Sequence, residues 1–347
     1  MSPASGAARI GVVTAGGDAP GLNAAIRALG RSALDVGDEV VGILNGWTGL
    51  LQEGGHRVLA EADYSGIVAR GGTILGSSRT VPLNDDASMS QLVSGVDRLA
   101  LDALVAIGGD GTLSLARRLS ERGVRIVGVP KTIDFDVDYT EVCIGFDSAL
   151  ATVVDALDRL HTTAASHHRV MVLETMGGHS GWLAALGGLA GGADVVCIPE
   201  FPIEIAEIAS RLVARRDAGK ESSIVIVAEG THVLGIDEEP VPCDEVGQPH
   251  LARRAIGETI ASAIESMIGG ESRATVLGYL QRGGAPVATD RVWASRLGAS
   301  AAALARTSGA DAVAVHDGQV VETSLATLTD KRRLVPESLY ELCRIVG

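Results

Sequence analysis

One short pattern occurs twice in this chain and constrains its fold most: an apolar strand, two glycines, an aspartate and then a helix. The first copy lies at residues 8–31 and contains Ala15-Gly-Gly-Asp; the second lies at residues 103–122 and contains Gly108-Gly-Asp-Gly-Thr. Glycines between a strand and a helix let backbone N–H groups face an anion at the positive end of the helix. Two such units predict an α/β fold in which both loops lie at the carboxyl ends of strands, where they could face each other across a cleft.

Each glycine loop by itself is a weak signal. The spacing of the first loop matches neither a P-loop nor a dinucleotide-binding fingerprint. Plain turn chemistry therefore remains an alternative to phosphate binding for that loop. A third glycine and hydroxyl loop, residues 71–79, ends on Arg79.

The stretch Val129–Asp136 places a lysine, a threonine and two aspartates directly after a predicted strand at residues 124–130. Open α/β sheets bind their ligands at the carboxyl ends of the strands. Asp134 could accept a proton from a substrate hydroxyl, Lys131 could meet an anionic group, and Asp136 could hold a metal or orient Asp134. The alternative is an ordinary polar turn that leaves a strand. The lysine is notable because the whole chain contains only three.

Composition limits the class of protein. The 347 residues, 46% of them hydrophobic and 44 of them glycine, suit two domains or one large α/β unit. A net charge of −14 argues against nucleic acid or an anionic membrane as a partner, so an anionic substrate would need locally placed cations and backbone N–H groups. No signal peptide and no membrane-length apolar run is evident, so we expect a cytoplasmic protein. Cys143 and Cys197 lie in apolar runs and are predicted to be core residues.

The rest of the chain continues the alternation of strands and helices. Helical apolar spacing begins at Ser148, and a helix follows Gly181. This alternation predicts largely parallel sheets. Further strands are predicted at residues 39–44, 170–173, 194–200, 223–229 and 274–279.

Taken together, these loops resemble the phosphofructokinase family, in the motif order of the family, from about residue 8 to residue 310. The motif Pro130-Lys-Thr-Ile-Asp is similar to that of a bacterial group whose members use either ATP or pyrophosphate as phosphoryl donor. The resemblance implies phosphoryl transfer to the C1 hydroxyl of fructose 6-phosphate, a step of glycolysis. It also implies two Rossmann-like three-layer α/β/α domains with the active site in the cleft between them.

The resemblance further implies that two parts of the chain bind different ligands. Residues 1–145 with about 281–331 would bind the phosphoryl donor. Residues from about 146 to 280, with 332–347, would bind the sugar phosphate. Members of the family are usually homotetramers or homodimers, and Arg169 and Arg273 match arginines that reach the active site of a neighbouring subunit.

The resemblance assigns a role to each candidate site residue. Asp134 would be the catalytic base, supported by Asp136 and Lys131, and Thr132 would contact the transferred phosphoryl group. Asp110 would hold Mg²⁺. The matched donor contacts are Gly17, Arg79, Asp110, Gly111 and Thr112. The matched sugar-phosphate contacts are Thr132, Asp134, Arg169, Met176, Gly177, Glu229, Arg273, Tyr279 and Arg282.

In the family that the chain resembles, two positions, Gly111 and Lys131, bear on the identity of the donor. Pyrophosphate users carry aspartate where this chain has Gly111, and that carboxylate occupies space and repels charge where the α-phosphate of a nucleotide would lie. Gly111 leaves the space open and favours ATP. Lys131 occurs in both donor groups and does not discriminate, whereas Leu44 and Leu115 depart from the adenine surroundings of many ATP users.

Three residues depart from the family at the acceptor end. Phe135 replaces an asparagine, Gly178 replaces an arginine, and Tyr279 replaces a histidine. A missing arginine at a phosphate costs a few kcal/mol of charge-assisted hydrogen bonding. The departures leave open a different sugar-phosphate acceptor, or a non-catalytic regulator that binds sugar phosphate or nucleotide. The intact aspartates argue against the regulator, because a pure binder needs no base.

Overall fold

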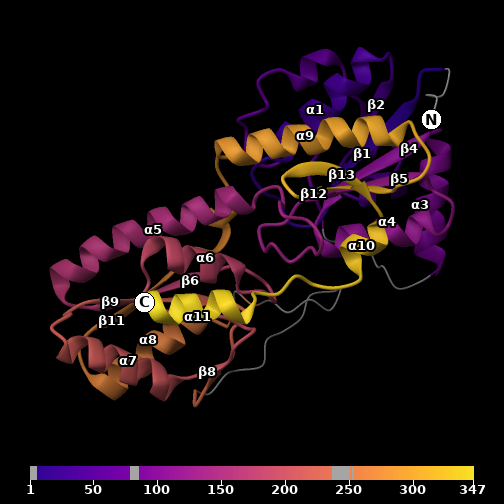
Figure 1. The fold of residues 1–347 in the computed structure, drawn as a ribbon. Helices are drawn as coiled ribbons and strands as arrows, with labels where there is room; N and C mark the ends of the chain where they lie inside the picture. Colours follow the sequence, from indigo (N-terminus) through magenta and orange to yellow (C-terminus); the bar gives the residue numbers. More distant parts are fainter. Residues whose placement is uncertain (1–5, 79–85, 237–250, 252–253) are drawn as a thin grey trace. The chain divides into compact units, whose positions relative to one another are not determined.

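The computed structural model describes residues 6–78, 86–236, 251 and 254–347. The chain divides into two compact units (Figure 1). The first unit comprises Met1–Ser148 with Arg282–Arg333. The second unit comprises Ala149–Gln281 with Leu334–Gly347. Arg79 lies outside the described residues, so the structure places no side chain for that candidate.

The first unit is built on a seven-stranded sheet in the order β13-β12-β5-β4-β1-β2-β3. Its interior strands pair in parallel, whereas β3 and β13 at the two edges pair antiparallel. Every residue of β4 is buried, because helices cover both faces of a parallel sheet. The strands are β1 Arg9–Thr14, β2 Glu39–Ile43, β3 His56–Val58, β4 Ala103–Gly108, β5 Ile126–Pro130, β12 Ala312–His316 and β13 Gln319–Thr323.

The helices of the first unit pack closely on this sheet and on one another. The helices are α1 Leu22–Asp35, α2 Thr48–Leu51, η1 Glu61–Tyr64, α3 Asp86–Arg98, α4 Asp110–Ser120, α9 Ala288–Ala305 and α10 Leu325–Thr329. Helices α1 and α9 lie side by side (Figure 1). A Cβ atom at Gly298 would lie 2.3 Å from the carbonyl oxygen of Ala25, so only glycine permits this approach.

Helix α5, Phe146–His167, begins in the first unit and continues into the second. Its amino end is capped by Asp290 of α9, a carboxylate that is 1% exposed. Asp290 accepts hydrogen bonds from the backbone N–H groups of Gly145 and Ser148, each at 2.8 Å, and from the Ser148 hydroxyl at 2.5 Å. The carboxylate therefore satisfies donors that a helix start leaves without partners.

We expect Asp290→Ala to lower the free energy of unfolding by about 2–4 kcal/mol, because it strands several buried donors. Chemical denaturation of the purified variant measures this loss. Asp155→Ala is the matched control, since Asp155 is an exposed partner of Arg159 and its pair contributes about 0.5 kcal/mol at most. Equal stability losses in the two variants would contradict the capping role.

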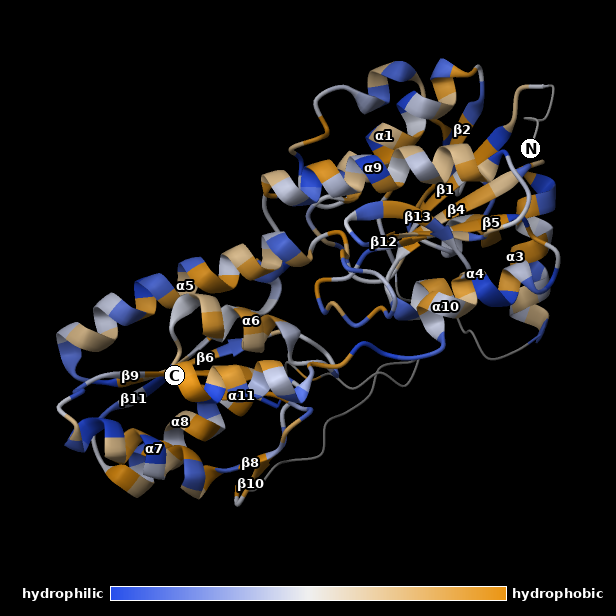
Figure 2. Cartoon of the chain, viewed as in Figure 1, coloured by the Kyte–Doolittle hydropathy of each residue, from blue (hydrophilic) through white to orange (hydrophobic). Residues whose placement is uncertain are grey.

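The second unit contains a four-stranded parallel sheet in the order β11-β6-β9-β7. Its strands are β6 Val170–Thr175, β7 Val195–Cys197, β9 Ser223–Ala228 and β11 Ser272–Val276, and a small parallel pair joins β8 Ile203–Glu204 to β10 Val233–Leu234. The other helices are α6 Trp182–Gly191, α7 Ile205–Asp217, α8 Ile256–Ile268, η3 Gly278–Gln281 and α11 Glu337–Val346. Figure 2 shows β1, β4 and β5 of the first unit largely apolar, whereas α7 of the second unit alternates apolar and polar residues, as expected for a helix with one face packed on the core.

The predicted α/β class with largely parallel sheets is confirmed. Cys143 and Cys197 are buried free thiols, as predicted, and burial raises the pKa of Cys197 to about 12. Within the described part of the chain, no helix is long and apolar enough to cross a membrane.

Candidate active site

Three aspartates gather at the carboxyl ends of two neighbouring strands in the first unit. Asp110 opens α4 immediately after β4, and Asp134 and Asp136 follow β5. β4 and β5 pair in parallel register, with Gly108 opposite Pro130. Parallel pairing therefore brings the two loops to one edge of the sheet, as the two sequence motifs predicted.

A threonine hydroxyl organises the loop after β5. The Thr132 hydroxyl accepts a hydrogen bond from the backbone N–H of Asp134 at 3.0 Å and donates one to Asp136 Oδ1 at 3.3 Å. Thr132 is itself buried. One hydroxyl therefore holds both aspartates in a fixed arrangement.

The surroundings of the cluster raise the pKa of Asp136 from its usual 3.8 to about 6. Burial is the largest cause, and the negative charges of Asp134 and Asp110 add to it. Arg332 opposes these effects through its positive charge. Crowded carboxylates with a perturbed pKa are typical of sites that handle protons or cations.

Lys131 lies where it organises the first glycine loop. The side chain is buried, and its ammonium donates hydrogen bonds to the carbonyl oxygens of Gly17 and, at 3.4 Å, of Ala15. The backbone N–H of Lys131 also bonds to the carbonyl of Gly108 in the second loop. Lys131 thus joins the two repeated loops, which the sequence pattern did not predict.

The amino end of α4 carries the donor-side candidates Gly111 and Thr112. The Thr112 side chain is buried against Gly108, where a Cβ atom would lie 2.3 Å from that of Thr112. A Cβ atom at Gly111 would have no heavy atom within 4 Å among the described residues. The backbone at Gly111 is open to substitution, and this matters for the identity of the donor.

Phe135 is packed, although the sequence suggested only the loss of a polar residue at this position. Its ring is 7% exposed and stacks on Phe146 with ring centroids 4.3 Å apart. The Arg333 guanidinium lies 4.1 Å from the ring centroid of Phe135 on this stack. Phe135 has a φ of 56°, in the left-handed region that a bulky residue rarely adopts.

The second unit brings a separate set of candidates together at the ends of β6 and β9. The backbone N–H of Gly178 bonds to Glu229 Oε1 at 3.2 Å, and that of Met176 bonds to Gln281 Oε1 at 3.3 Å. At Gly177 a Cβ atom would lie 2.4 Å from the carbonyl oxygen of Ser180, so glycine is required there. Gly178 has a φ of 59°, which disfavours an arginine at this position.

The remaining candidates have different surroundings. Arg169 and Arg273 both pair with Glu271, and Arg273 also contacts Glu265 at 3.2 Å. Tyr279 in η3 is 75% exposed. In the first unit, Arg282 is buried and donates a hydrogen bond to the Asp18 carbonyl at 3.1 Å.

Comparisons with known proteins agree with this arrangement. A family model described as phosphofructokinase matches residues 9–305. The chain belongs to the phosphofructokinase family. It is 44% identical over 345 residues to an ATP-dependent 6-phosphofructokinase of Chloroflexus aurantiacus, covering 96% of this chain and 95% of that protein.

Other members of the phosphofructokinase family are also similar. A pyrophosphate–fructose 6-phosphate 1-phosphotransferase of Amycolatopsis mediterranei is 43% identical over 335 residues, which cover 96% of this chain and 98% of that protein. The structure of Pichia pastoris phosphofructokinase in the T-state matches with a TM-score of 0.81 and 31% identity. That match covers 94% of this chain but only 36% of the Pichia chain.

Sequence reasoning did not identify three polar residues around these sites: Arg332, Arg333 and Gln281. Gln281 is fully buried and bonds the Met176 backbone, but a lone glutamine carries no signal. The arginines belong to the run Lys331-Arg-Arg, a cluster of positive charge in a chain of net charge −14. That cluster was the available signal, although only the fold brings it to the aspartates.

Proposed function

We propose that this phosphofructokinase family member is an ATP-dependent 6-phosphofructokinase that converts fructose 6-phosphate to fructose 1,6-bisphosphate. The observation that carries the proposal is the cluster of Asp110, Asp134 and Asp136 at one sheet edge. Its support from relatives is the 44% identity to a protein named as an ATP-dependent 6-phosphofructokinase.

In the proposed mechanism, Asp134 takes the proton from the C1 hydroxyl of the sugar phosphate. The Thr132 hydroxyl fixes the backbone of Asp134 and also contacts the transferred phosphoryl group. Asp136 adds negative charge beside the base and so supports proton uptake. Lys131 acts indirectly: its ammonium donates to the carbonyl of Gly17 and so fixes the loop that is proposed to bind the donor phosphates.

The residues fit a magnesium site at Asp110. The described residues contain no group of three or more His, Cys, Asp or Glu side chains arranged to hold a metal. Mg²⁺, however, is usually held by one or two carboxylates together with substrate phosphates, and the Asp110 side chain is 30% exposed. Asp110 would hold the Mg²⁺, which would supply positive charge to offset the negative charge that develops during phosphoryl transfer.

We assign the sugar phosphate chiefly to the second unit. The backbone of Met176 and Gly177, with the buried carboxylate of Glu229, would bind the sugar, and Arg282 of the first unit would meet phosphate. Arg169 and Arg273 would reach the 6-phosphate bound by a neighbouring subunit of a homotetramer or homodimer. Their pairing with Glu271 keeps both guanidinium groups on one surface of the unit.

We expect Gly111→Asp to lower kcat/KM for ATP at least tenfold, because a carboxylate there repels the α-phosphate of a nucleotide. Gly111→Ala is the matched control and should stay within twofold, since a Cβ atom meets open space at this position. Initial rates with Mg²⁺ and fructose 6-phosphate measure both. Unchanged ATP use by Gly111→Asp would refute this account of donor choice.

Pyrophosphate is the second candidate donor, because the Amycolatopsis mediterranei relative is named for its use. Initial rates that cross ATP and pyrophosphate with fructose 6-phosphate and sedoheptulose 7-phosphate test donor and acceptor together. Turnover confined to the seven-carbon sugar would make Phe135, Gly178 and Tyr279 the residues to test for a changed acceptor. Tight ligand binding without turnover for any pair would instead favour a regulator.

A further inference from the structure

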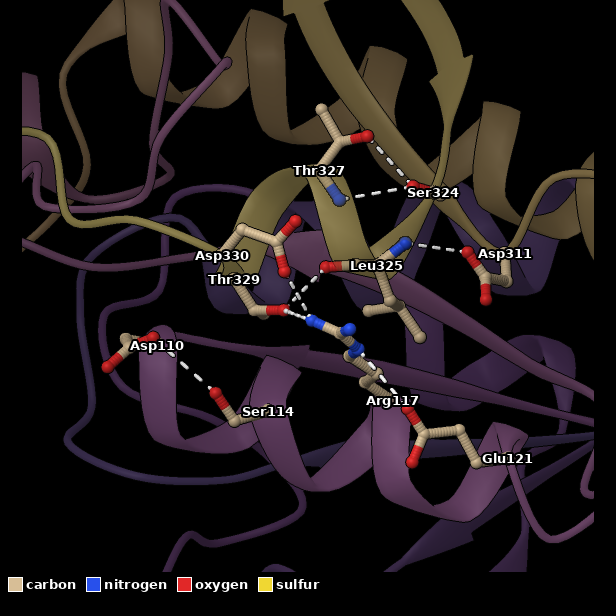
Figure 3. A network of polar contacts seen from close by, with 10 residues as sticks. All are labelled: Asp110, Ser114, Arg117, Glu121, Asp311, Ser324, Leu325, Thr327, Thr329 and Asp330. Carbon is tan, nitrogen blue, oxygen red and sulfur yellow. Dashed lines mark hydrogen bonds and ion pairs between the residues drawn. The ribbon is translucent and has the colours of Figure 1, made fainter.

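The segment Asp330–Arg333, which we call the strap, follows α10 in the first unit and contacts both α4 and the loop after β5. One end of the strap is fixed to α4 itself. Arg117 Nη1 donates to Asp330 Oδ1 at 2.5 Å and to Thr329 Oγ1 at 3.4 Å (Figure 3). Helix α10, which leads into the strap, is capped by Ser324 and by the bond from the Leu325 N–H to Asp311. The start of the strap therefore follows a capped helix and contacts α4 through a partly exposed ion pair.

The other end of the strap is fixed to the loop that carries the catalytic aspartates. The backbone N–H of Arg333 bonds to the carbonyl of Asp136 at 2.9 Å, and its Nη1 bonds to the Thr140 carbonyl at 2.7 Å. Val137 and Arg332 form an antiparallel bridge. The strap therefore pairs, through this one bridge and the backbone bond of Arg333, with the segment that follows Asp134.

Between these anchors, the side chain of Arg332 reaches the proposed metal and donor site. Its Nη2 lies 3.7 Å from Asp110 Oδ2, which is too long for a hydrogen bond, and the side chain is 44% exposed. Its charge also acts on Asp136. An anchored backbone with a loosely held guanidinium leaves that group able to bind a second anion.

We propose that Arg332 binds the phosphoryl donor beside Asp110, and that Phe135 positions Arg332 by holding the strap. The proposal rests on the function proposed above for the aspartate cluster, and it names residues to which that function gave no role. The ligand class is a nucleoside triphosphate or pyrophosphate, whose phosphate oxygens suit the planar fork of an arginine.

The geometry favours donor binding over a purely local balance of charge. An arginine that only neutralised the cluster would be expected to bond directly to its carboxylates, whereas Arg332 stands 3.7 Å off and remains half exposed. A cation in the same place would also compete with Mg²⁺ for Asp110. The two readings therefore predict opposite effects of removing Arg332: donor binding weakens in the first and strengthens in the second.

Phe135 is assigned the positioning role because of its strained backbone. A bulky residue at a φ of 56° is costly, whereas asparagine adopts this region readily. The stack of Phe146, Phe135 and the Arg333 guanidinium offsets that cost and also fixes the end of the strap. Backbone strain that is held by packing beside a site is a recognised mark of function.

The first experiment titrates the protein, by calorimetry with Mg²⁺ and no sugar phosphate, with the β,γ-imido analogue of ATP and separately with pyrophosphate. We expect Arg332→Gln to raise the dissociation constant of the bound donor at least tenfold, and Arg332→Lys to recover part of the loss. Lys331→Gln removes the neighbouring positive charge and should change the dissociation constant of the donor less than twofold. Unchanged or tighter binding by Arg332→Gln would overturn the proposal.

The second experiment tests positioning with a double-mutant cycle. Phe135→Asn suits the backbone and should keep the thermal midpoint, yet raise the dissociation constant about fivefold. In the Arg332→Gln background, Phe135→Asn should raise the dissociation constant of the donor less than twofold further, because the side chain that Phe135 positions is already absent. The positioning role would be refuted if Phe135→Asn weakened donor binding fivefold in the Arg332→Gln background as well. It would also be refuted if Phe135→Asn alone left donor binding unchanged. Arg333→Lys replaces Phe135→Asn if that variant does not fold, with the same expectations.

The outcome for the unsubstituted protein separates this proposal from the function on which it rests. If the unsubstituted protein binds neither donor, both fail together. If it binds a donor and turns over fructose 6-phosphate while Arg332→Gln binds equally well, only the role of Arg332 fails.

Discussion

Asp134→Asn is expected to lower kcat about 10³-fold while the dissociation constants of donor and sugar phosphate change less than threefold. An amide of the same shape cannot take the proton of the C1 hydroxyl, and a positioned general base contributes 10²–10⁴-fold. The backbone N–H of Asp134 keeps its bond to Thr132, so the loop retains its shape. Steady-state rates, together with calorimetric binding of each ligand, measure the two halves of this expectation.

Asp138→Asn is the matched control, since it makes the same chemical change four residues along the same loop. Asp138 caps the backbone N–H of Tyr139, and asparagine can accept that bond equally well. Its kcat should stay within twofold. If Asp134→Asn retained a tenth or more of the activity, Asp134 would not be the base, and another group would have to take the proton.

Local pattern was sufficient to predict the sheet-building elements. The strands β1, β4, β5 and β9 are short apolar runs bounded by glycine, proline or a charged residue. Runs of this length are too short for a typical helix and are typical of buried strands. The β12–β13 hairpin and the strap were not predicted. Asp317-Gly318 was an available local signal for the hairpin, because both residues have a positive φ in the two-residue turn that joins β12 to β13. The strap offered no such signal, because its pairing partner Val137 lies far away in sequence.

The aspartates were predictable because parallel strands bring the loops that follow them to one edge, and residue identity alone then suggests the chemistry. The surroundings of those residues were not predictable. Lys131 looked like an anion-binding residue, yet its ammonium holds two loop carbonyls. Phe135 looked like a lost polar contact, yet it packs between Phe146 and Arg333. Such roles depend on tertiary neighbours, which a single sequence does not display.

Asp136→Asn is expected to stabilise the protein above pH 6 while it impairs turnover. Burial and the charges of Asp134 and Asp110 raise the pKa of Asp136 from its usual 3.8 to about 6, and Arg332 only partly offsets them. The folded state therefore holds a proton that the unfolded state releases between pH 4 and 6. Stability from this group is present below about pH 4 and is lost as pH rises through 6.

The amide carries no charge and so avoids this loss. Two pKa units correspond to about 3 kcal/mol, or roughly 6–12 °C in the melting temperature of a unit of this size. Melting curves without Mg²⁺ should show that gain for Asp136→Asn at pH 8 and none at pH 4. If the variant and the unsubstituted protein melted at the same temperature at pH 8 as well as at pH 4, the pKa of Asp136 would not be raised in the folded state. A gain at pH 8 with lost turnover would show that the cluster keeps a destabilising charge because catalysis needs it.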